Sequence, residues 1–193
     1  GSLKCWGNNS HGQLGMGSDV PSIGGEALQM GDALLPVSIG EGVTDVVAGY
    51  QHTCALTDSG RVACFGDNSE GQLGLGDRDS RGLEGSDLSN VFVELDGRAV
   101  SLSAGPSHTC ALLENGALKC WGNNLFGQLA LGHSENQGDD PDEMGSDLEA
   151  VSIGEGRSLR QVAAGGAFTC GLDDLHQVRC WGRNENGILG GNW

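Results

Sequence analysis

The chain has few basic residues and no long hydrophobic run. It contains 10 Lys and Arg residues against 26 Asp and Glu residues among 193, which gives a formal net charge of −16. A field of this sign repels phosphate backbones, so we expect no direct binding to DNA or RNA. No apolar stretch approaches the roughly 20 residues that a transmembrane helix requires. The sequence therefore predicts a chain with no membrane span and with partners other than nucleic acids.

Residue groupings typical of enzymes are also missing. No Ser-His-Asp or Cys-His grouping recurs along the chain, and His11, His133 and His176 fall in loops without a common partner. The glycine-rich phrases lack the lysine of a Walker motif and the strand-to-helix setting of a dinucleotide site. The sequence therefore predicts no enzyme activity, no cofactor and no catalytic residue.

Helix-favouring segments are scarce because glycine is abundant. The chain has 35 glycines, and a glycine in a helix interior costs about 1 kcal/mol relative to alanine. Short strands joined by glycine corners are the remaining regular structure. A unit of about four short strands cannot bury its apolar face alone, but it can when stacked radially beside its neighbours, as in a β-propeller blade. An all-β fold is therefore expected.

Four copies of one phrase run through the chain. They read WGNNSHGQLGMG at 6–17, FGDNSEGQLGLG at 65–76, WGNNLFGQLALG at 121–132 and WGRNENGILGGN at 181–192. The cysteines just before them, Cys5, Cys64, Cys120 and Cys180, are 59, 56 and 60 residues apart. Self-similarity at a long period indicates a repeat architecture.

A second phrase precedes three of these copies. It reads VVAGYQHTCALTDSGRVAC at 46–64, LSAGPSHTCALLENGALKC at 102–120 and VAAGGAFTCGLDDLHQVRC at 162–180. Two apolar runs flank residues that favour tight turns, such as those at 58–60 and 114–116. Each unit is therefore predicted to contain a β-hairpin with flanking strands.

The combined pattern, A-G-x-x-H-T-x-A-L and then G-x-x-x-C-W-G-x-N-x-x-G-Q-L-G-x-G, resembles the repeats of the regulator of chromosome condensation family. The second and third copies carry it at Gly49, His52, Leu56, Gly66, Asn68, Gly71, Gln72, Leu73 and Gly74, and at Gly105, His108, Leu112, Gly122, Asn124, Gly127, Gln128 and Leu129. The last copy departs from it, with Phe168 in place of the histidine and Ile188 in place of the glutamine.

The resemblance implies a β-propeller, because members of this family form seven-bladed propellers. One repeat domain, 1–193, is expected to form a partial ring of about three and a half repeats. The repeats fall at about 1–17, which is partial, and at 43–76, 99–132 and 159–193, joined by acidic and glycine-rich segments. Cys5 has no partner cysteine upstream, so we expect a fragment of a longer repeat protein that self-associates through exposed blade faces.

For function, a non-catalytic scaffold for protein–protein interaction is expected. The family name also suggests guanine nucleotide exchange on a small GTPase. A secreted or cell-surface recognition module is a third hypothesis, favoured by the paired cysteines and the acidic surface.

The recurring histidines and tryptophans are interpreted as structural. His52 and His108 occupy equivalent positions, which favours a hydrogen bond inside each blade over catalysis or metal binding. Trp6, Trp121 and Trp181 recur once per unit, which favours large aromatic side chains packed between blades.

A recurring asparagine is interpreted as a loop cap. It precedes a glycine by three residues, a placement suited to side-chain capping of a tight loop and to a positive φ. The four positions are Asn9, Asn68, Asn124 and Asn184.

Three cysteine pairs are candidate disulfides. Their members stand ten positions apart, on opposite arms of each predicted hairpin: Cys54 and Cys64, Cys110 and Cys120, and Cys170 and Cys180. Each bond would stabilise the fold by roughly 2–3 kcal/mol. Reduced, buried thiols remain an alternative, whereas a zinc site on His52, Cys54 and Cys64 lacks a fourth ligand. Bonded pairs favour an extracellular or secretory location, and free thiols a cytoplasmic or nuclear one.

Acidic residues gather between repeats. The segment 133–149 contains no Lys or Arg and carries Glu135, Asp139, Asp140, Asp142, Glu143, Asp147 and Glu149. We interpret it as a solvated surface loop, with calcium binding as an open alternative, since its spacing matches no EF-hand loop.

Overall fold

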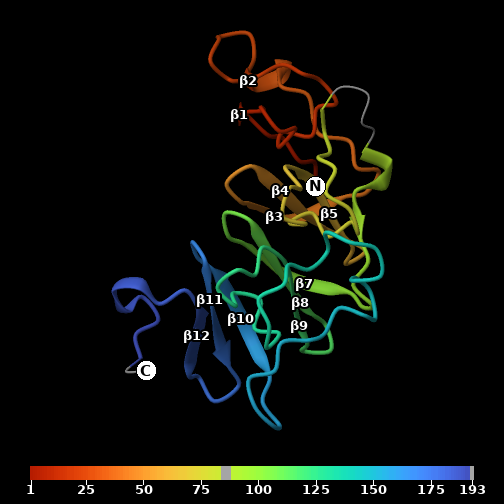
Figure 1. The fold of residues 1–193 in the computed structure, drawn as a ribbon. Helices are drawn as coiled ribbons and strands as arrows, with labels where there is room; N and C mark the ends of the chain where they lie inside the picture. The colour runs from red at the N-terminus through yellow and green to blue at the C-terminus, as the bar shows by residue number, and fades with distance from the viewer. Residues whose placement is uncertain (84–87, 192–193) are drawn as a thin grey trace.

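The computed structural model describes residues 1–83 and 88–191, so the last two residues of the repeat expected at 159–193 lie outside the described residues (Figure 1). Its regular structure is almost entirely β. The strands are β1 (Gly7–Asn8), β2 (Ser22–Ile23), β3 (Val43–Ala48), β4 (His52–Thr57), β5 (Val62–Gly66), β6 (Phe92–Val93), β7 (Ala99–Ala104), β8 (His108–Leu113), β9 (Leu118–Gly122), β10 (Leu159–Ala164), β11 (Phe168–Asp173) and β12 (Val178–Gly182). Short 3-10 helices are η1 (Gly31–Ala33), η2 (Leu88–Asn90) and η3 (Glu185–Gly187).

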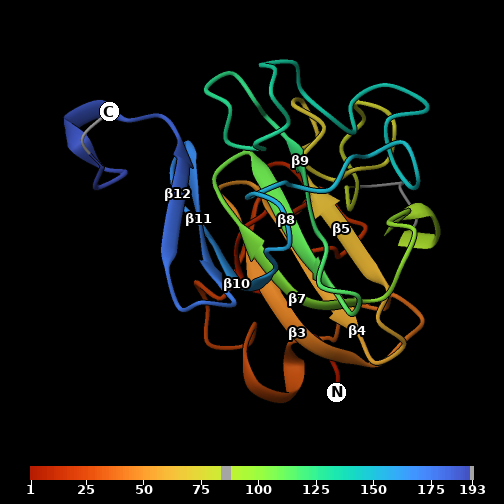
Figure 2. The same ribbon diagram turned by 90° about the horizontal axis from the view of Figure 1, so that it is seen from below.

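The strands form separate antiparallel sheets in chain order. Their orders are β1-β2, β3-β4-β5-β6, β7-β8-β9 and β10-β11-β12. The sheets that begin with β3, β7 and β10, here called blades 2, 3 and 4, stand side by side, with those three strands next to one another (Figure 2). Blade 1 denotes residues 1–42. The expected partial propeller is confirmed, because the sheets are blade-like and the ring is not closed.

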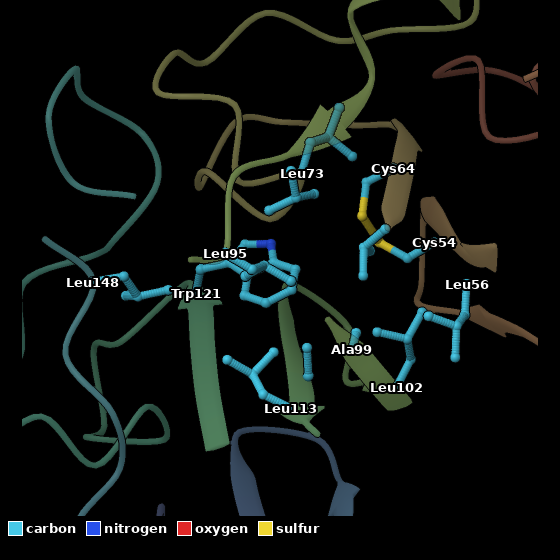
Figure 3. Packing of buried hydrophobic residues seen from close by; sticks show 13 residues of the cluster. Cys54, Leu56, Cys64, Leu73, Leu95, Ala99, Leu102, Leu113, Trp121 and Leu148 are labelled. Atoms are coloured by element: carbon cyan, nitrogen blue, oxygen red, sulfur yellow. A yellow bond between two sulfur atoms is a disulfide. The ribbon is translucent and has the colours of Figure 1, made fainter. Parts of the chain in front are cut away.

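The hydrophobic core lies between blades. Successive side chains of a strand point to opposite faces. In blade 2, Ala63 and Phe65 therefore pack toward Leu3 of blade 1, whereas Cys64 packs toward Trp121 of blade 3. Figure 3 shows the second of these interfaces, where the indole ring lies among leucines of two blades and the intervening loops. Each blade is thus stabilised mainly by its neighbours.

The hairpin turns have one strained position. Gly60 and Gly116 adopt φ values of 81° and 85°, and His176 occupies the equivalent place in blade 4 with φ 61°. A left-handed conformation costs a non-glycine residue roughly 1–2 kcal/mol. The two glycine turns have the residue type that this geometry favours, and the third does not.

Replacing His176 by glycine should therefore raise the free energy of unfolding by about 1 kcal/mol, because the left-handed strain disappears while an exposed side chain is lost. Gln177→Gly is the matched control, since Gln177 is also exposed and has no positive φ. Urea denaturation of both variants measures the effect. Destabilisation by His176→Gly would contradict the assignment of strain to this turn.

Among the described residues, no helix has the length and apolar character that crossing a membrane requires.

Candidate functional site: an inter-blade network beneath variable loops

A threonine and a tryptophan donate to one carbonyl group between blades 2 and 3, and a histidine bonds to the threonine. His52 Nε2 lies 2.9 Å from Thr109 Oγ1, and the Thr109 hydroxyl donates to the Gln72 carbonyl at 3.0 Å. Since that hydroxyl has a single hydrogen, it accepts from the His52 Nε2–H. Trp121 Nε1 donates to the same Gln72 carbonyl at 3.0 Å. The four groups connect the two blades through hydrogen bonds that are shielded from water.

The network repeats one interface further along. His108 Nε2 lies 3.0 Å from Thr169 Oγ1, which donates to the Gln128 carbonyl at 2.9 Å, and Trp181 Nε1 donates there at 2.9 Å. The histidine bond expected inside each blade therefore crosses to the next blade. The sequence defines the hairpin register, but the partner of a side chain at its edge depends on how neighbouring sheets are oriented.

The histidines are held neutral. His52 and His108 are each 1% exposed, and their Nδ1 atoms have no hydrogen-bond partner. Burial lowers the pKa of both rings to about 4, and for His52 the nearby His108 adds to this effect. The backbone leaves no room beside the ring, because a Cβ atom on Gly49 would lie 2.4 Å from His52 Nδ1. The buried, neutral ring of each histidine therefore has a structural role, because it joins one blade to the next by a hydrogen bond.

The recurring tryptophans differ in burial. Trp121 is fully buried, whereas Trp181 is half-buried. Trp6 was expected to pack between blades, but it is 61% exposed. Trp121 packs on the loop of the preceding unit, so closely that a Cβ atom on Gly74 would lie 2.7 Å from its Nε1. No described unit precedes Trp6, so Trp6 has no such loop to pack on.

The repeated asparagines tie down the loops that follow β5 and β9. Asn124 Oδ1 accepts from the Leu129 N–H at 3.0 Å, and its Nδ2 donates to the carbonyls of His133 and Glu135 at 2.9 Å each. Equivalent bonds occur at Asn9 and Asn68, and Asn184 Oδ1 likewise accepts from the Leu189 N–H at 3.1 Å. None of the four has a positive φ; the glycine three residues later does.

The three cysteine pairs are disulfides in the structure. Cys54 pairs with Cys64, Cys110 with Cys120, and Cys170 with Cys180, each across directly opposite strand positions. The first two bonds are fully buried, and the third is half-buried. Cys5 is a free thiol whose pKa is raised by burial to about 11.

The exposure difference predicts an order of reduction. When the folded protein is treated with a mild reductant and then alkylated, Cys170 and Cys180 should react first, because the other two bonds are shielded from thiolate attack. Peptide mapping by mass spectrometry identifies the labelled cysteines. Under denaturing, non-reducing conditions only Cys5 should be labelled; labelling of all seven cysteines would contradict the disulfide assignment.

The acidic segment shows no cage of metal ligands. Across residues 1–83 and 88–191, no three His, Cys, Asp or Glu side chains stand together in a way that could hold a metal ion. Asp139, the buried carboxylate of the segment, forms an ion pair with Arg78. The carboxylate of Glu143 accepts from the backbone N–H groups of residues 138–140.

Variable side chains are displayed on the loop tips above this network. The two residues after each capping asparagine form a different pair in each copy, although the first is serine in two of them; the pairs are 10–11, 69–70, 125–126 and 185–186. The loops after β5, β9 and β12 lie at the same end of their sheets, at the upper side of Figure 2, opposite the hairpin turns. A repeated framework thus presents a different pair of side chains at each blade.

Sequential β-blades, connected by a buried network and carrying variable loops, define a β-propeller repeat protein. Residues 1–56 and 59–112 match the family profile described as Regulator of chromosome condensation (RCC1) repeat, and residues 43–72, 99–128 and 159–188 match a second profile of the same description. The chain therefore belongs to the regulator of chromosome condensation repeat family.

Known proteins of this family resemble the chain over most of its length. It is 35% identical to the human regulator of chromosome condensation over 92% of this chain and 40% of that protein. It is 39% identical to the mouse X-linked retinitis pigmentosa GTPase regulator over 69% of this chain and 12% of that protein. The structure of Prp20p from Saccharomyces cerevisiae superimposes with a TM-score of 0.70 at 21% identity, over 100% of this chain and 43% of that one, which shows the shared fold. The chain spans about half or less of the curated relatives it matches.

Structure exposes residues that sequence reasoning did not assign. Thr109, Thr169 and the backbone carbonyls of Gln72 and Gln128 complete the inter-blade network. A signal was present, since the threonine follows the histidine position in every copy of the second phrase and the glutamine recurs in Gly-Gln-Leu.

Proposed function

We propose that the chain is a non-catalytic scaffold that binds protein partners through its variable loop tips. The proposal rests on one observation: the repeated residues hold the blades together, and different residues form the exposed surface. The polar groups repeated at the two interfaces between blades 2, 3 and 4, such as His52 and Thr109, are buried and bonded to one another. The exposed side chains on the loop tips vary while the backbone beneath them stays the same. A rigid frame with changing surface groups favours recognition over chemistry.

The negative net charge of the chain favours some classes of partner over others. With a formal net charge of −16, the protein repels nucleic acid phosphates and attracts basic protein surfaces. Protein partners of complementary charge are therefore proposed in preference to DNA or RNA.

Site-specific photo-crosslinking tests the proposal. In the full-length protein, a benzophenone amino acid is placed at Ser69 or at Leu125, on the loop tips. Each should crosslink to a partner polypeptide, and mass spectrometry then identifies that partner. The same probe at Asn115, on the hairpin turn at the opposite end of blade 3, is the control. Equal crosslinking from both ends, or none from the tips, would contradict a loop-tip binding surface.

A GTPase-directed activity is a second candidate, favoured by the 39% identity to a protein named as a GTPase regulator. Release of a fluorescent guanine nucleotide from a Ran-type GTPase measures it. A scaffold leaves the release rate unchanged, whereas a rate that rises with the concentration of this protein would favour the second candidate. The disulfides favour an extracellular recognition module as the setting for a scaffold, since such bonds persist in oxidising compartments.

A further inference from the structure

The third loop tip differs from the others by exposing two adjacent apolar side chains. Leu125 is 65% exposed and Phe126 is 43% exposed. The corresponding residues in blade 2 are Ser69 and Glu70, on a loop that forms the same turn bond, from the glycine N–H to the asparagine carbonyl, at 3.0 Å in one and 2.8 Å in the other. The fold therefore does not require an apolar residue at either position.

Leu125 also borders an acidic cleft between blades 2 and 3. The cleft has a volume of about 410 Å³, and its carboxylates are Glu70, Glu135, Asp139, Asp140 and Glu143. Its one cationic side chain, Arg78, is paired with Asp139. Among the described residues, the other four carboxylates have no Lys, Arg or His partner.

On the blade 2 side of the cleft, two hydrogen bonds hold Glu70 in place. Glu70 Oε2 accepts from Asn123 Nδ2 and from Asn136 Nδ2, both at 2.8 Å. On the far side of the loop tip, Arg183 of blade 4 stacks on the Phe126 ring, 4.8 Å from its centroid, and pairs with Glu185. Because Arg78 and Arg183 are both paired with carboxylates and the other carboxylates of the cleft have no cationic partner, the surface around Leu125 and Phe126 is mostly negative.

We propose that Leu125, Phe126 and the adjacent cleft bind a peptide segment in which Lys or Arg side chains flank a bulky apolar residue. The apolar residue covers Leu125 and the exposed edge of Phe126, and the cations enter the cleft beside Glu135 and Asp140. Exposed apolar side chains give binding energy through burial, and uncompensated carboxylates select the charge of the partner. This inference rests on the proposed scaffold function and names its partner class.

Fluorescence anisotropy on the full-length protein tests the surface with defined probes. The probe is a fluorescein-labelled Gly/Ser peptide in which lysines flank a single leucine. One control peptide replaces its lysines by glutamates, and the other replaces its leucine by serine. Both controls should bind at least about tenfold more weakly, and the affinity of the probe should fall with rising salt. Equal binding of the serine peptide would show attraction by charge alone and would overturn the proposal.

Two variants locate the site. Leu125→Ser with Phe126→Glu installs the residues of blade 2 and should weaken the probe at least about tenfold without a change in Tm, although it makes the surface more acidic. Glu135→Gln with Asp140→Asn should also weaken it. Glu114→Gln with Glu155→Gln removes the same charge elsewhere and should leave affinity unchanged; equal loss in this control would overturn the assignment. If the variant with Leu125→Ser and Phe126→Glu still binds a crosslinked partner, the proposed binding surface would be refuted, while the scaffold function would remain supported.

Discussion

Replacing Trp121 by alanine should lower the free energy of unfolding by about 3–5 kcal/mol. The indole ring is 0% exposed, packs among residues of blades 2 and 3, and donates from Nε1 to the Gln72 carbonyl at 3.0 Å (Figure 3). Truncation leaves a cavity between two blades and removes a hydrogen bond shielded from water. Native stability of a domain is about 5–15 kcal/mol, so this loss is a large share of the total.

The repeat supplies matched controls for this substitution. Trp6→Ala changes the same residue type at the equivalent position, but Trp6 is 61% exposed, so its effect should stay within about 0.5 kcal/mol. Trp121→Phe installs the residue that blade 2 carries as Phe65, and it should cost about 1 kcal/mol because the lost Nε1 bond dominates. Urea denaturation followed by far-UV circular dichroism measures all three. Equal effects of Trp121→Ala and Trp6→Ala would contradict inter-blade packing as the main source of stability.

The sequence predicts the hairpins well because their signals are local. The apolar runs, the turn residues at 58–60 and the ten-residue cysteine spacing act within one unit, and the structure places Cys54 directly opposite Cys64. The family pattern then gives the propeller, since each unit can bury its faces only against similar units. The hairpins involve contacts between residues close in the chain, and the propeller is inferred from the repeated pattern.

Features that depend on the angle between blades could not be predicted. The partner of His52 lies 57 residues away on Thr109, and nothing within one repeat indicates that the imidazole points outward from its own sheet. The exposure of Trp6 likewise depends on the presence of a neighbour rather than on the residue itself. The acidic cleft beside Leu125 is assembled from side chains of the loop after β5 and of the segment after β9, so neither repeat alone indicates it.

Acidification from pH 7 to pH 4.5 should destabilise the protein through His52 and His108. Burial lowers the pKa of each from 6.5 to about 4 in the folded state, so the unfolded chain binds more protons between these values. The free energy of unfolding is therefore fully retained above about pH 6.5 and falls as pH drops, by up to about 1.4 kcal/mol per pH unit for each histidine. Protonation places a hydrogen on Nδ1, which has no acceptor, and the combined loss by pH 4.5 is about 5 kcal/mol.

Asp173 loses its stabilising contribution at a lower pH than the two histidines do. Burial would raise the pKa of Asp173, but hydrogen bonds from the Gln177 backbone, Arg179 and the Leu175 backbone outweigh it and hold this pKa below 3.8. Its stabilising contribution is present above about pH 3.8 and is lost only at lower pH. The loss expected between pH 6.5 and pH 4.5 therefore precedes that of Asp173.

Urea denaturation at a series of pH values measures this slope. His52→Gln with His108→Gln retains an N–H donor near each threonine but removes the titration, so the double variant should lose most of the slope between pH 6.5 and pH 4.5 even if it is less stable at pH 7. His133→Gln changes an exposed histidine and should keep the wild-type slope. A wild-type profile that is flat over this range would contradict the burial of two neutral imidazoles between the blades. A steep profile that persists in the double variant would instead assign the pH dependence to other groups, and the inter-blade histidines would then contribute only through packing and hydrogen bonding.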